Sequence, residues 1–158
     1  MTITKPSLND IISLYASYAA SIDEERFDDW VEFFTDNCVY KVIPRENYDA
    51  GRPLASMSLK GVAGLRDRIY GVTSTVFHAP YYQRHIIGLP LVKSQDGDLL
   101  SVEANYLVLR TKRDQLTEVY NAGRYIDIIQ VGSRGLKFQE KLCVFDSELI
   151  PNSLIYPI

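Results

Sequence analysis

The hydrophobic pattern at the start of the chain predicts an amphipathic helix. Its apolar residues follow the i, i+3, i+4, i+7 rule of one helical face, namely Leu8, Ile11, Ile12, Tyr15, Tyr18, Ala19 and Ile22. Ser7 precedes this face and has Asp10 three positions on, which is typical of a capped helix N-terminus. The sequence therefore predicts a first helix over residues 8 to 22.

A second helix, a strand and a third helix are expected to follow. The second helix repeats the apolar pattern from Phe27 to Phe34 and is expected to stop at residues 35 to 37. The run "CVYKVIP" predicts a strand that ends at Pro44. Residues 45 to 60 are rich in turn formers, with a short strand expected near 54 to 59, and "GLRDRIYGV" predicts a helix over about 61 to 72.

The second half of the chain alternates between apolar and polar positions with the period of a strand. Four long segments, "YYQRHIIG", "LLSVEANYLVLRTK", "TEVYNAGRYIDIIQV" and "GLKFQEKLCVFDSEL", are separated by turn-like stretches such as "QDGD" and "GSRG". In the last segment the alternation places Phe138, Glu140 and Leu142 on one face of the strand and residues 137, 139 and 141 on the other. Long strands joined by short turns predict a curved antiparallel meander.

Helices that precede a curved antiparallel sheet define an α+β layout. We expect the apolar helix faces to cover one side of the sheet, so that sheet and helices form a cone with a pocket inside. The chain has 158 residues, of which 46% are hydrophobic and 23% charged, with no internal repeat or linker. We therefore expect residues 1 to 158 to form a single domain.

Charge and cysteine content exclude several classes of protein. The net charge of −3, without a basic cluster, gives no electrostatic reason to bind nucleic acid. No apolar run approaches the ~18 residues of a membrane span, and "MTITKPSLNDIISLY" lacks the pattern of a signal peptide. Cys38 and Cys143 are accordingly expected to be reduced and buried, in a cytoplasmic protein.

Both histidines lie in the stretch "STVFHAPYYQRHIIG", residues 74 to 88. His78 and His85 are seven positions apart with Pro80 between them, which fits neither the i, i+4 ligand spacing of a helix nor the i, i+2 spacing of a strand. An iron site that takes two histidines and a distant carboxylate stays open. His85 is interpreted first as a hydrogen-bonded structural residue and second as an acid–base residue facing the pocket.

Asp23 differs from the other acidic residues near it because it lies where the first helix ends. It is interpreted either as a cap of the second helix or as a carboxylate at the mouth of the cone, beside Tyr18 or Tyr40. Tyrosine is abundant, with eleven residues. These side chains suit an aromatic ligand pocket, a packed core or a protein interface equally well.

Six segments along the chain, in their order and spacing, carry a resemblance to a known family. They are "YAASIDEERFDDWVEFFTDNCVYKV" (18 to 42), "GLRDRIYGV" (64 to 72), "PYYQRHIIG" (80 to 88), "ANYLVLRTK" (104 to 112), "NAGRYID" (121 to 127) and "KLCVFDSELIPNSLIYPI" (141 to 158). Through them the chain resembles, over nearly its whole length, the small (β) subunit of Rieske-type aromatic-ring-hydroxylating dioxygenases. Within that family it is most similar to the salicylate hydroxylase, anthranilate and terephthalate types.

The resemblance implies a cone-shaped NTF2-like (cystatin-like) fold and a hexamer of three large and three small subunits. The large subunit would carry a Rieske [2Fe–2S] centre and a mononuclear non-haem iron, and would receive electrons from NAD(P)H through a reductase and a ferredoxin. A Rieske centre alone needs two cysteines and two histidines, which is all that this chain has. The small subunit is therefore expected to be mainly structural, without a cofactor, a metal or catalytic residues of its own.

In this interpretation, residues of "YYQRH" and of the apolar C-terminus contact other subunits. Arginine and tyrosine suit such contacts, because both combine packing area with directed hydrogen bonds. The residues expected there are Tyr81, Tyr82, Arg84, Ile155, Tyr156 and Ile158. The segment "LIPNSLIYPI" is too apolar to stay in water, so we expect it to dock on this domain or on a neighbour.

Two other functions remain possible from the sequence. In the first, the chain is a dehydratase-, isomerase- or cyclase-like enzyme of the same fold, with His85 as the base and Asp23, Tyr18 and Tyr40 in support. In the second, the cone binds an aromatic acid, whose carboxylate pairs with Arg84 or Arg124.

Overall fold

The structure is a computed structural model, and it describes residues 5–149 and 154–158. The helices are α1 (Leu8–Asp23), α2 (Phe27–Val31), α3 (Arg45–Asp49) and α4 (Gly61–Tyr70), followed by the π-helical turn η1 (Gly71–Thr75). The strands are β1 (Phe34–Pro44), β2 (Met57–Lys60), β3 (Tyr81–Ile87), β4 (Leu91–Asp96), β5 (Leu99–Lys112), β6 (Glu118–Gly132) and β7 (Gly135–Phe145).

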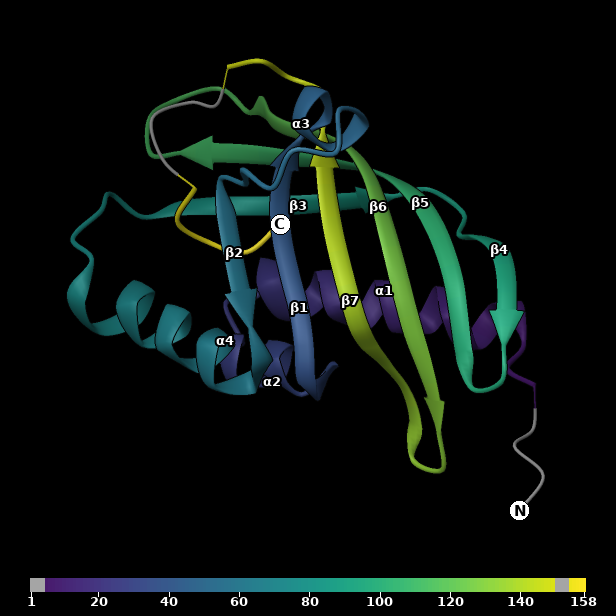
Figure 1. The fold of residues 1–158 in the computed structure, drawn as a ribbon. Coiled ribbons are helices and arrows are strands. Elements are labelled where there is room, and N and C mark those ends of the chain that lie inside the picture. Colours follow the sequence, from purple (N-terminus) through teal and green to yellow (C-terminus); the bar gives the residue numbers. More distant parts are fainter. Residues whose placement is uncertain (1–4, 150–153) are drawn as a thin grey trace.

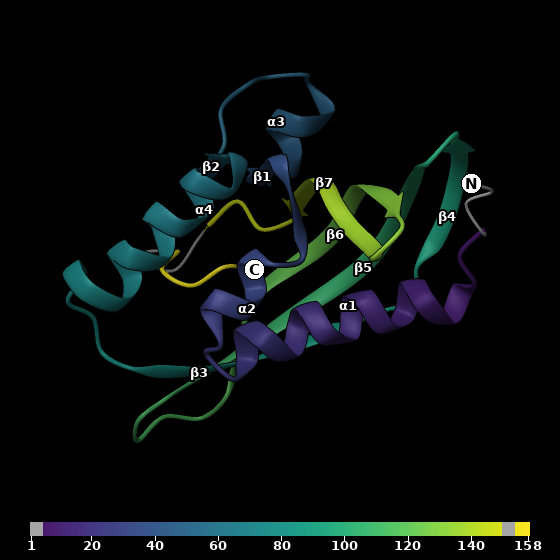
Figure 2. The same ribbon diagram turned by 90° about the horizontal axis from the view of Figure 1, so that it is seen from below.

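The strands form one curved sheet that α1 crosses on its inner face (Figures 1 and 2). The strand order is β2-β1-β7-β6-β5-β3, and β4 also pairs with β5. All neighbouring strands are antiparallel except β1 and β7, which are parallel. The predicted α+β fold, with N-terminal helices on a strongly curved and mostly antiparallel sheet, is confirmed.

Two bulges and one glycine allow the sheet to curve. The register shifts between β5 and β6 at Val108, and between β6 and β7 at Ile128. Bulges of this kind bend a strand and increase its twist. Gly123 on β6 lies so close to β7 that a Cβ atom there would be 2.0 Å from the carbonyl oxygen of Val144. Only glycine fits this close approach of two backbones.

The first helix forms as predicted, and it begins with a capping box. The Ser7 hydroxyl accepts a hydrogen bond from the Asp10 amide at 3.2 Å, and the Asp10 carboxylate accepts one from the Ser7 amide at 2.8 Å. These bonds satisfy two amide groups at the start of the helix. Within residues 5–149 and 154–158, no helix combines the length and the apolar character needed to cross a membrane.

The predicted second helix is too long. It ends at Val31, and Phe34 already belongs to β1, where it lies opposite Phe138 of β7. The Phe138 amide donates to the Phe33 carbonyl at 2.8 Å, so sheet pairing replaces the last helical turn. Helix α3 and strand β4 were not predicted, because neither buries a residue and so neither shows an apolar period.

The predicted alternation of the last strand is wrong beyond Phe138. Ile129 pairs with Phe138 and Ile128 with Glu140, so Gln139 is the extra residue of a bulge. A single inserted residue moves every later side chain to the opposite face. Lys141 is consequently fully buried, whereas Glu140 and Leu142 are partly exposed on the outer side.

The C-terminal segment docks inside its own domain. Tyr156 and Ile158 belong to the hydrophobic core, together with residues of α1, α2, α4 and the inner face of the sheet. Residues 150 to 153 lie outside the described residues, and Leu149 is exposed, so the predicted docking is confirmed for 154–158 only. Cys38 and Cys143 are free and buried, as expected.

Buried tyrosines are expected to make the fold sensitive to alkali. Among the described residues, burial raises the pKa of eight tyrosine hydroxyls above the usual value, and five of them are the most deeply buried, namely Tyr15, Tyr18, Tyr40, Tyr106 and Tyr125. In the unfolded chain they ionise near pH ~10, so the unfolded state loses protons first and stability falls as the pH rises further. Each of these groups lowers the free energy of unfolding by about 1.4 kcal/mol per pH unit until it ionises in the folded state.

Urea unfolding followed by circular dichroism between about pH 8 and about pH 11 measures this loss. Above pH ~10, Tyr18→Phe should reduce the slope of the free energy of unfolding against pH by the equivalent of about one proton. Tyr70→Phe, at an exposed position, should leave this slope unchanged. A free energy of unfolding that stays constant up to pH ~11 would contradict the prediction.

Candidate functional site

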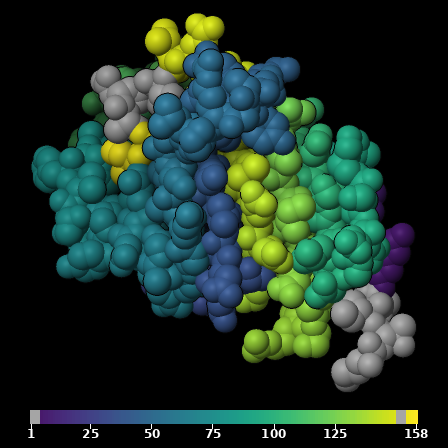
Figure 3. Space-filling model, viewed as in Figure 1, coloured from purple at the N-terminus to yellow at the C-terminus, as the bar shows by residue number. Residues whose placement is uncertain are grey.

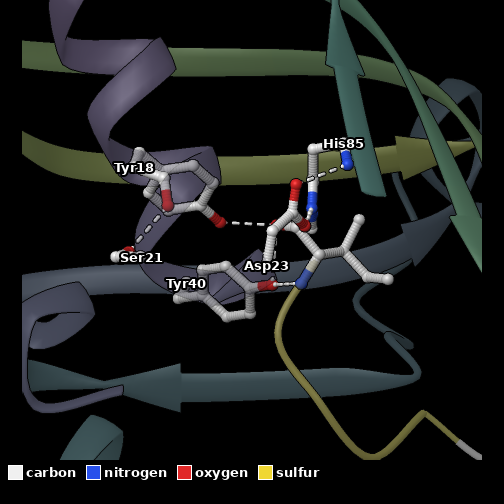
Figure 4. A network of polar contacts seen from close by, with 6 residues as sticks. Tyr18, Ser21, Asp23, Tyr40 and His85 are labelled. Carbon is white, nitrogen blue, oxygen red and sulfur yellow. Dashed lines mark hydrogen bonds and ion pairs between the residues drawn. The ribbon is translucent and has the colours of Figure 1, made fainter. Parts of the chain in front are cut away.

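Asp23 and His85 form a buried pair between the end of α1 and strand β3 (Figure 4). One Asp23 oxygen lies 2.6 Å from His85 Nδ1, and the other accepts a hydrogen bond from the His85 backbone amide at 2.9 Å. The two side chains are 6% and 0% exposed. A single carboxylate thus binds both the backbone and the ring of one histidine.

The position of each residue in the fold explains the pair. A carboxylate at a helix C-terminus is unfavourable because it faces the negative end of the helix dipole. Strand β3 is the sheet edge, and its amide groups that point away from β5 need other acceptors. Asp23 and His85 satisfy one another at this edge. The predicted role of Asp23 as a cap of α2 is wrong, since Arg26 occupies that position and makes no side-chain cap bond.

The pair has the connectivity of a base oriented by a carboxylate, but its reactive nitrogen is enclosed. With Nδ1 bonded to Asp23, Nε2 is the atom that would take a proton. Nε2 is buried and has no hydrogen-bond partner among the described residues. His85 and Asp23 contribute to the wall of a pocket of about 350 Å³ between α1 and β3, yet Nε2 itself is not exposed to this pocket.

Tyr18 and Tyr40 do not join this pair; both bind the C-terminal segment instead (Figure 4). The Tyr18 hydroxyl donates to the Ile158 backbone oxygen, and the Tyr40 hydroxyl accepts a hydrogen bond from the Ile158 amide at 2.8 Å. Burial raises the pKa of both hydroxyls, which keeps them protonated. The structure therefore divides the four residues of the predicted enzyme site into two separate groups.

The other histidine also binds the C-terminal segment. His78 Nε2 lies 3.0 Å from the Tyr156 hydroxyl, and the Tyr156 ring packs against Tyr81 with ring centroids 4.5 Å apart. No three side chains of His, Cys, Asp or Glu meet as metal ligands anywhere in residues 5–149 and 154–158.

The four residues of a Rieske ligand set are not arranged for iron. Burial raises the pKa of the Cys143 thiol to about 12, so the group stays neutral, whereas iron binds the thiolate. His85 is already engaged with Asp23, and His78 with Tyr156. These residues do not fit a [2Fe–2S] centre.

Neither of the two arginines proposed to hold a carboxylate is buried inside the cone. Arg84 alternates with the buried Gln83 and His85 and is exposed. Arg124 lies opposite Asn105 at a partly exposed position, about 4 Å from Asp49 and Glu103.

The buried cation inside the cone is instead Lys141, which the sequence analysis missed. Its ammonium group lies 2.9 Å from Asp127, and both side chains are fully buried. The Tyr15 hydroxyl donates to the same Asp127 oxygen. Burial raises the pKa of Asp127, although Lys141 and Tyr15 oppose this shift. Asp127 alternates along its strand with the inward-facing Tyr125 and Ile129, so the sequence pattern could have placed it inside the cone. The bulge that turns Lys141 inward produces no recognisable pattern in the sequence.

The residues predicted to contact other subunits fall into two groups. Tyr82 and Arg84 are exposed, and Ile155 is partly buried. Tyr81, Tyr156 and Ile158 are taken up by the core of their own chain. The subunit contact therefore stays a prediction, and it now rests on Tyr82, Arg84 and Ile155.

The fold is an α+β cone whose interior is filled by its own side chains. A SnoaL-like domain family model matches residues 6–141. The anthranilate 1,2-dioxygenase small subunit of Burkholderia cepacia is 31% identical over 150 residues, covering 94% of this chain and 92% of that protein. The β2 subunit of the terminal oxygenase component of a Comamonas terephthalate 1,2-dioxygenase is 30% identical, with coverage of 94% and 96%.

The solved structures agree. A protein of Novosphingobium aromaticivorans, assigned as the β subunit of an aromatic-ring-hydroxylating dioxygenase, superposes with a TM-score of 0.88 at 32% identity and 96% coverage of both chains. The benzoate 1,2-dioxygenase β subunit of Burkholderia mallei gives 0.79 at 18% identity, covering 94% and 97%, which shows the shared fold. The chain belongs to the SnoaL-like family and, within it, to the small subunits of aromatic-ring-hydroxylating dioxygenases, as non-catalytic subunits.

Replacing Asp23 is expected to destabilise the fold. Asp23→Ala leaves the His85 amide and ring nitrogen without their acceptor, which should lower the free energy of unfolding by about 2 kcal/mol or more. Asp28→Ala removes an exposed carboxylate nearby and should change it by less than about 0.5 kcal/mol. Equal losses in urea unfolding would show that the pair contributes nothing specific.

Proposed function

We propose that this chain is the small, mainly structural subunit of a multicomponent Rieske oxygenase that hydroxylates the ring of an aromatic acid. Anthranilate and terephthalate, both aromatic acids, appear in the names of its relatives. The observation that supports a structural role most directly is the occupied interior, where residues 154–158 and the buried tyrosines fill the cone. Catalysis would then belong to a large subunit that holds the [2Fe–2S] centre and the mononuclear iron.

The proposed assembly contains three large and three small subunits, with this chain as a single domain of each small subunit. It would work in the cytoplasm and receive electrons from NAD(P)H through a reductase and a ferredoxin. The relatives include a subunit of a terminal oxygenase component, a term that denotes one member of a multicomponent system.

The outer face of the sheet supports such an assembly. The inner face is covered by α1, whereas much of the outer face of β7, β6 and β5 remains open in the view of Figure 3. Ile126 and Leu142 lie opposite each other on this face and are only partly buried. Open apolar surface on a sheet is typical of a face that a partner covers.

A second exposed strip follows β3 and its neighbours. Tyr82, Ile86 and Val119 are 76%, 53% and 62% exposed. Arg84 pairs across the sheet with Leu109, which in turn pairs with Val119, so these side chains share one face. We propose this strip as the subunit contact that includes Tyr82 and Arg84, with Ile155 at a separate point of the surface.

The two other functions lack the geometry that they require. An enzyme based on His85 needs an accessible Nε2, and this atom is enclosed. A binding module for aromatic acids needs an arginine inside the cone, whereas Arg84 is exposed and Arg124 is partly exposed.

Purification of the tagged chain from cells grown on an aromatic acid tests the proposal. We expect a brown complex that contains iron and a larger chain in equal amounts, because the small chain itself cannot assemble a Rieske ligand set. Mass spectrometry identifies the partner, and sedimentation gives the stoichiometry. A colourless, iron-free protein without a partner would contradict the proposal.

The same preparation with His85→Ala is the control for catalysis in this chain. A folded complex with unchanged kcat supports a purely structural role. A folded complex with full iron content and lost turnover would favour the enzyme alternative.

Charge reversal on the exposed strip is expected to weaken assembly. Arg84→Glu places a carboxylate where an exposed guanidinium lies, without touching the core. We expect the dissociation constant for the large subunit, or for the hexamer, to rise by about tenfold or more, as for loss of an interface arginine. Arg134→Glu, in the turn between β6 and β7, is the matched control and should change it little. Equal behaviour of both variants would place the contact elsewhere.

A further inference from the structure

Residues 154–158 lie inside the cone without belonging to the sheet. They form no strand, and they make no backbone–backbone hydrogen bond with any residue that the structure describes. Side chains hold the segment instead. Arg68 of α4 donates to the carbonyl oxygens of Leu154 and Ile155, the latter at 2.8 Å. A segment that is held only by side-chain hydrogen bonds and apolar contacts resembles a bound ligand more than a helix or strand of the fold.

Three donors from three different elements converge on one backbone oxygen at the end of the segment. The Ile158 oxygen is within hydrogen-bond reach of the hydroxyls of Tyr18 on α1 and Tyr40 on β1, the latter at 3.2 Å, and of the Cys143 thiol on β7 at 3.5 Å. Tyr18, Tyr40, Cys143 and Ile158 are at most 1% exposed. The fold thus carries a buried set of neutral donors directed at a single oxygen atom.

An aromatic slot lies beside these donors. The Tyr156 ring packs between Phe27, at a centroid distance of 5.3 Å, and Tyr81, at 4.5 Å. Its hydroxyl reaches His78 Nε2 at 3.0 Å, and its backbone amide donates to the Tyr81 hydroxyl at 3.4 Å. The walls of the slot belong to α2, β3 and the turn before β3, and only its content belongs to the C-terminal segment.

We propose that residues 154–158 act as an intramolecular ligand that closes a binding site of the cone, and that the site takes a small aromatic molecule with an oxygen acceptor when the segment withdraws. Such a molecule places its oxygen at the Tyr18 and Tyr40 hydroxyls and its ring where Tyr156 and Ile158 now pack. Withdrawal without a replacement leaves buried donors without an acceptor, which is unfavourable. A ligand that restores both the acceptor and the apolar contacts removes that cost.

The site does not depend on the proposed function. Assembly with a large subunit concerns the outer face and β3, whereas the closed site lies between the inner face and the helices. A chain that fails to bind a large subunit can still show the site, and a chain that assembles can lack it.

The test loosens the segment in the full-length chain with the double variant Tyr156→Gly/Ile158→Gly. Acetophenone is the probe, and ethylbenzene is the matched molecule without the oxygen. Calorimetry measures affinity, and the indole NMR signal of Trp30 reports the site, since Trp30 is the only tryptophan and its ring lies 5.4 Å from that of Tyr40.

We expect saturable binding of acetophenone to the double variant, with ethylbenzene binding about fivefold more weakly, the factor for one neutral hydrogen bond. Adding Tyr40→Phe should reduce this discrimination. The unmodified chain and Leu149→Gly, an exposed position before the segment, should bind far more weakly. A folded double variant that does not bind acetophenone, or that binds both molecules equally, overturns the proposal.

Hydrogen exchange on the unmodified chain tests withdrawal independently of whether the double variant folds. If the segment leaves without unfolding the sheet, the amides of Ile155, Tyr156 and Ile158 exchange at least about tenfold faster than those of Tyr125 and Ile129 in β6. Exchange of both groups at the same rate shows that the segment opens only with global unfolding, and it overturns the proposal.

Discussion

The ion pair between Lys141 and Asp127 is the constraint on which the interior of this fold depends. Removing two charges from water is costly, and a single bond of 2.9 Å does not offset that cost by itself. The Lys141 ammonium also lies 3.5 Å from the Tyr125 ring centroid and within 5 Å of the rings of Tyr15, Tyr18 and Phe138. An aromatic cage of this kind stabilises a buried cation, so the dense packing of tyrosines around the pair is a requirement of the pair.

This arrangement has a consequence for function. The cage and the ion pair join α1, β6 and β7, and the C-terminal segment occupies the space beside them, so the concave side of the sheet is used for stability. The Asp23–His85 pair follows the same logic at the edge of the sheet, where it fastens the end of α1 to β3. The concave side is thus filled by the chain's own side chains, which agrees with membership in the small subunits of aromatic-ring-hydroxylating dioxygenases.

The sequence predicted those features that depend on local periodicity. The helix over Leu8–Asp23, its Ser7 cap, the long strands and the α+β class all follow from repeated patterns. It did not predict the orientation of Lys141, because the bulge at Gln139 changes the phase of the strand and depends on pairing with β6. For the same reason the pairing of Asp23 with His85 was one possibility among several: residues 62 positions apart meet only through the packing of α1 on β3. Tyr18 and Tyr40 were grouped with them because sequence alone does not show where residues 154–158 lie.

An interior closed in this way also determines where the protein can interact. Helices cover the inner face and the C-terminal segment fills the cone, so the apolar side chains that a partner can reach lie elsewhere on the surface, as Ile86 on β3 and Val119 on β6 illustrate. A sheet with a packed interior presents a rigid face, and a rigid face loses little entropy when a partner covers it. An enzyme of the same fold faces the opposite demand, since a substrate site must remain open at the cost of packing. A filled cone gains packing, and an open cone keeps space for a substrate. This chain fills the cone with its own C-terminal residues.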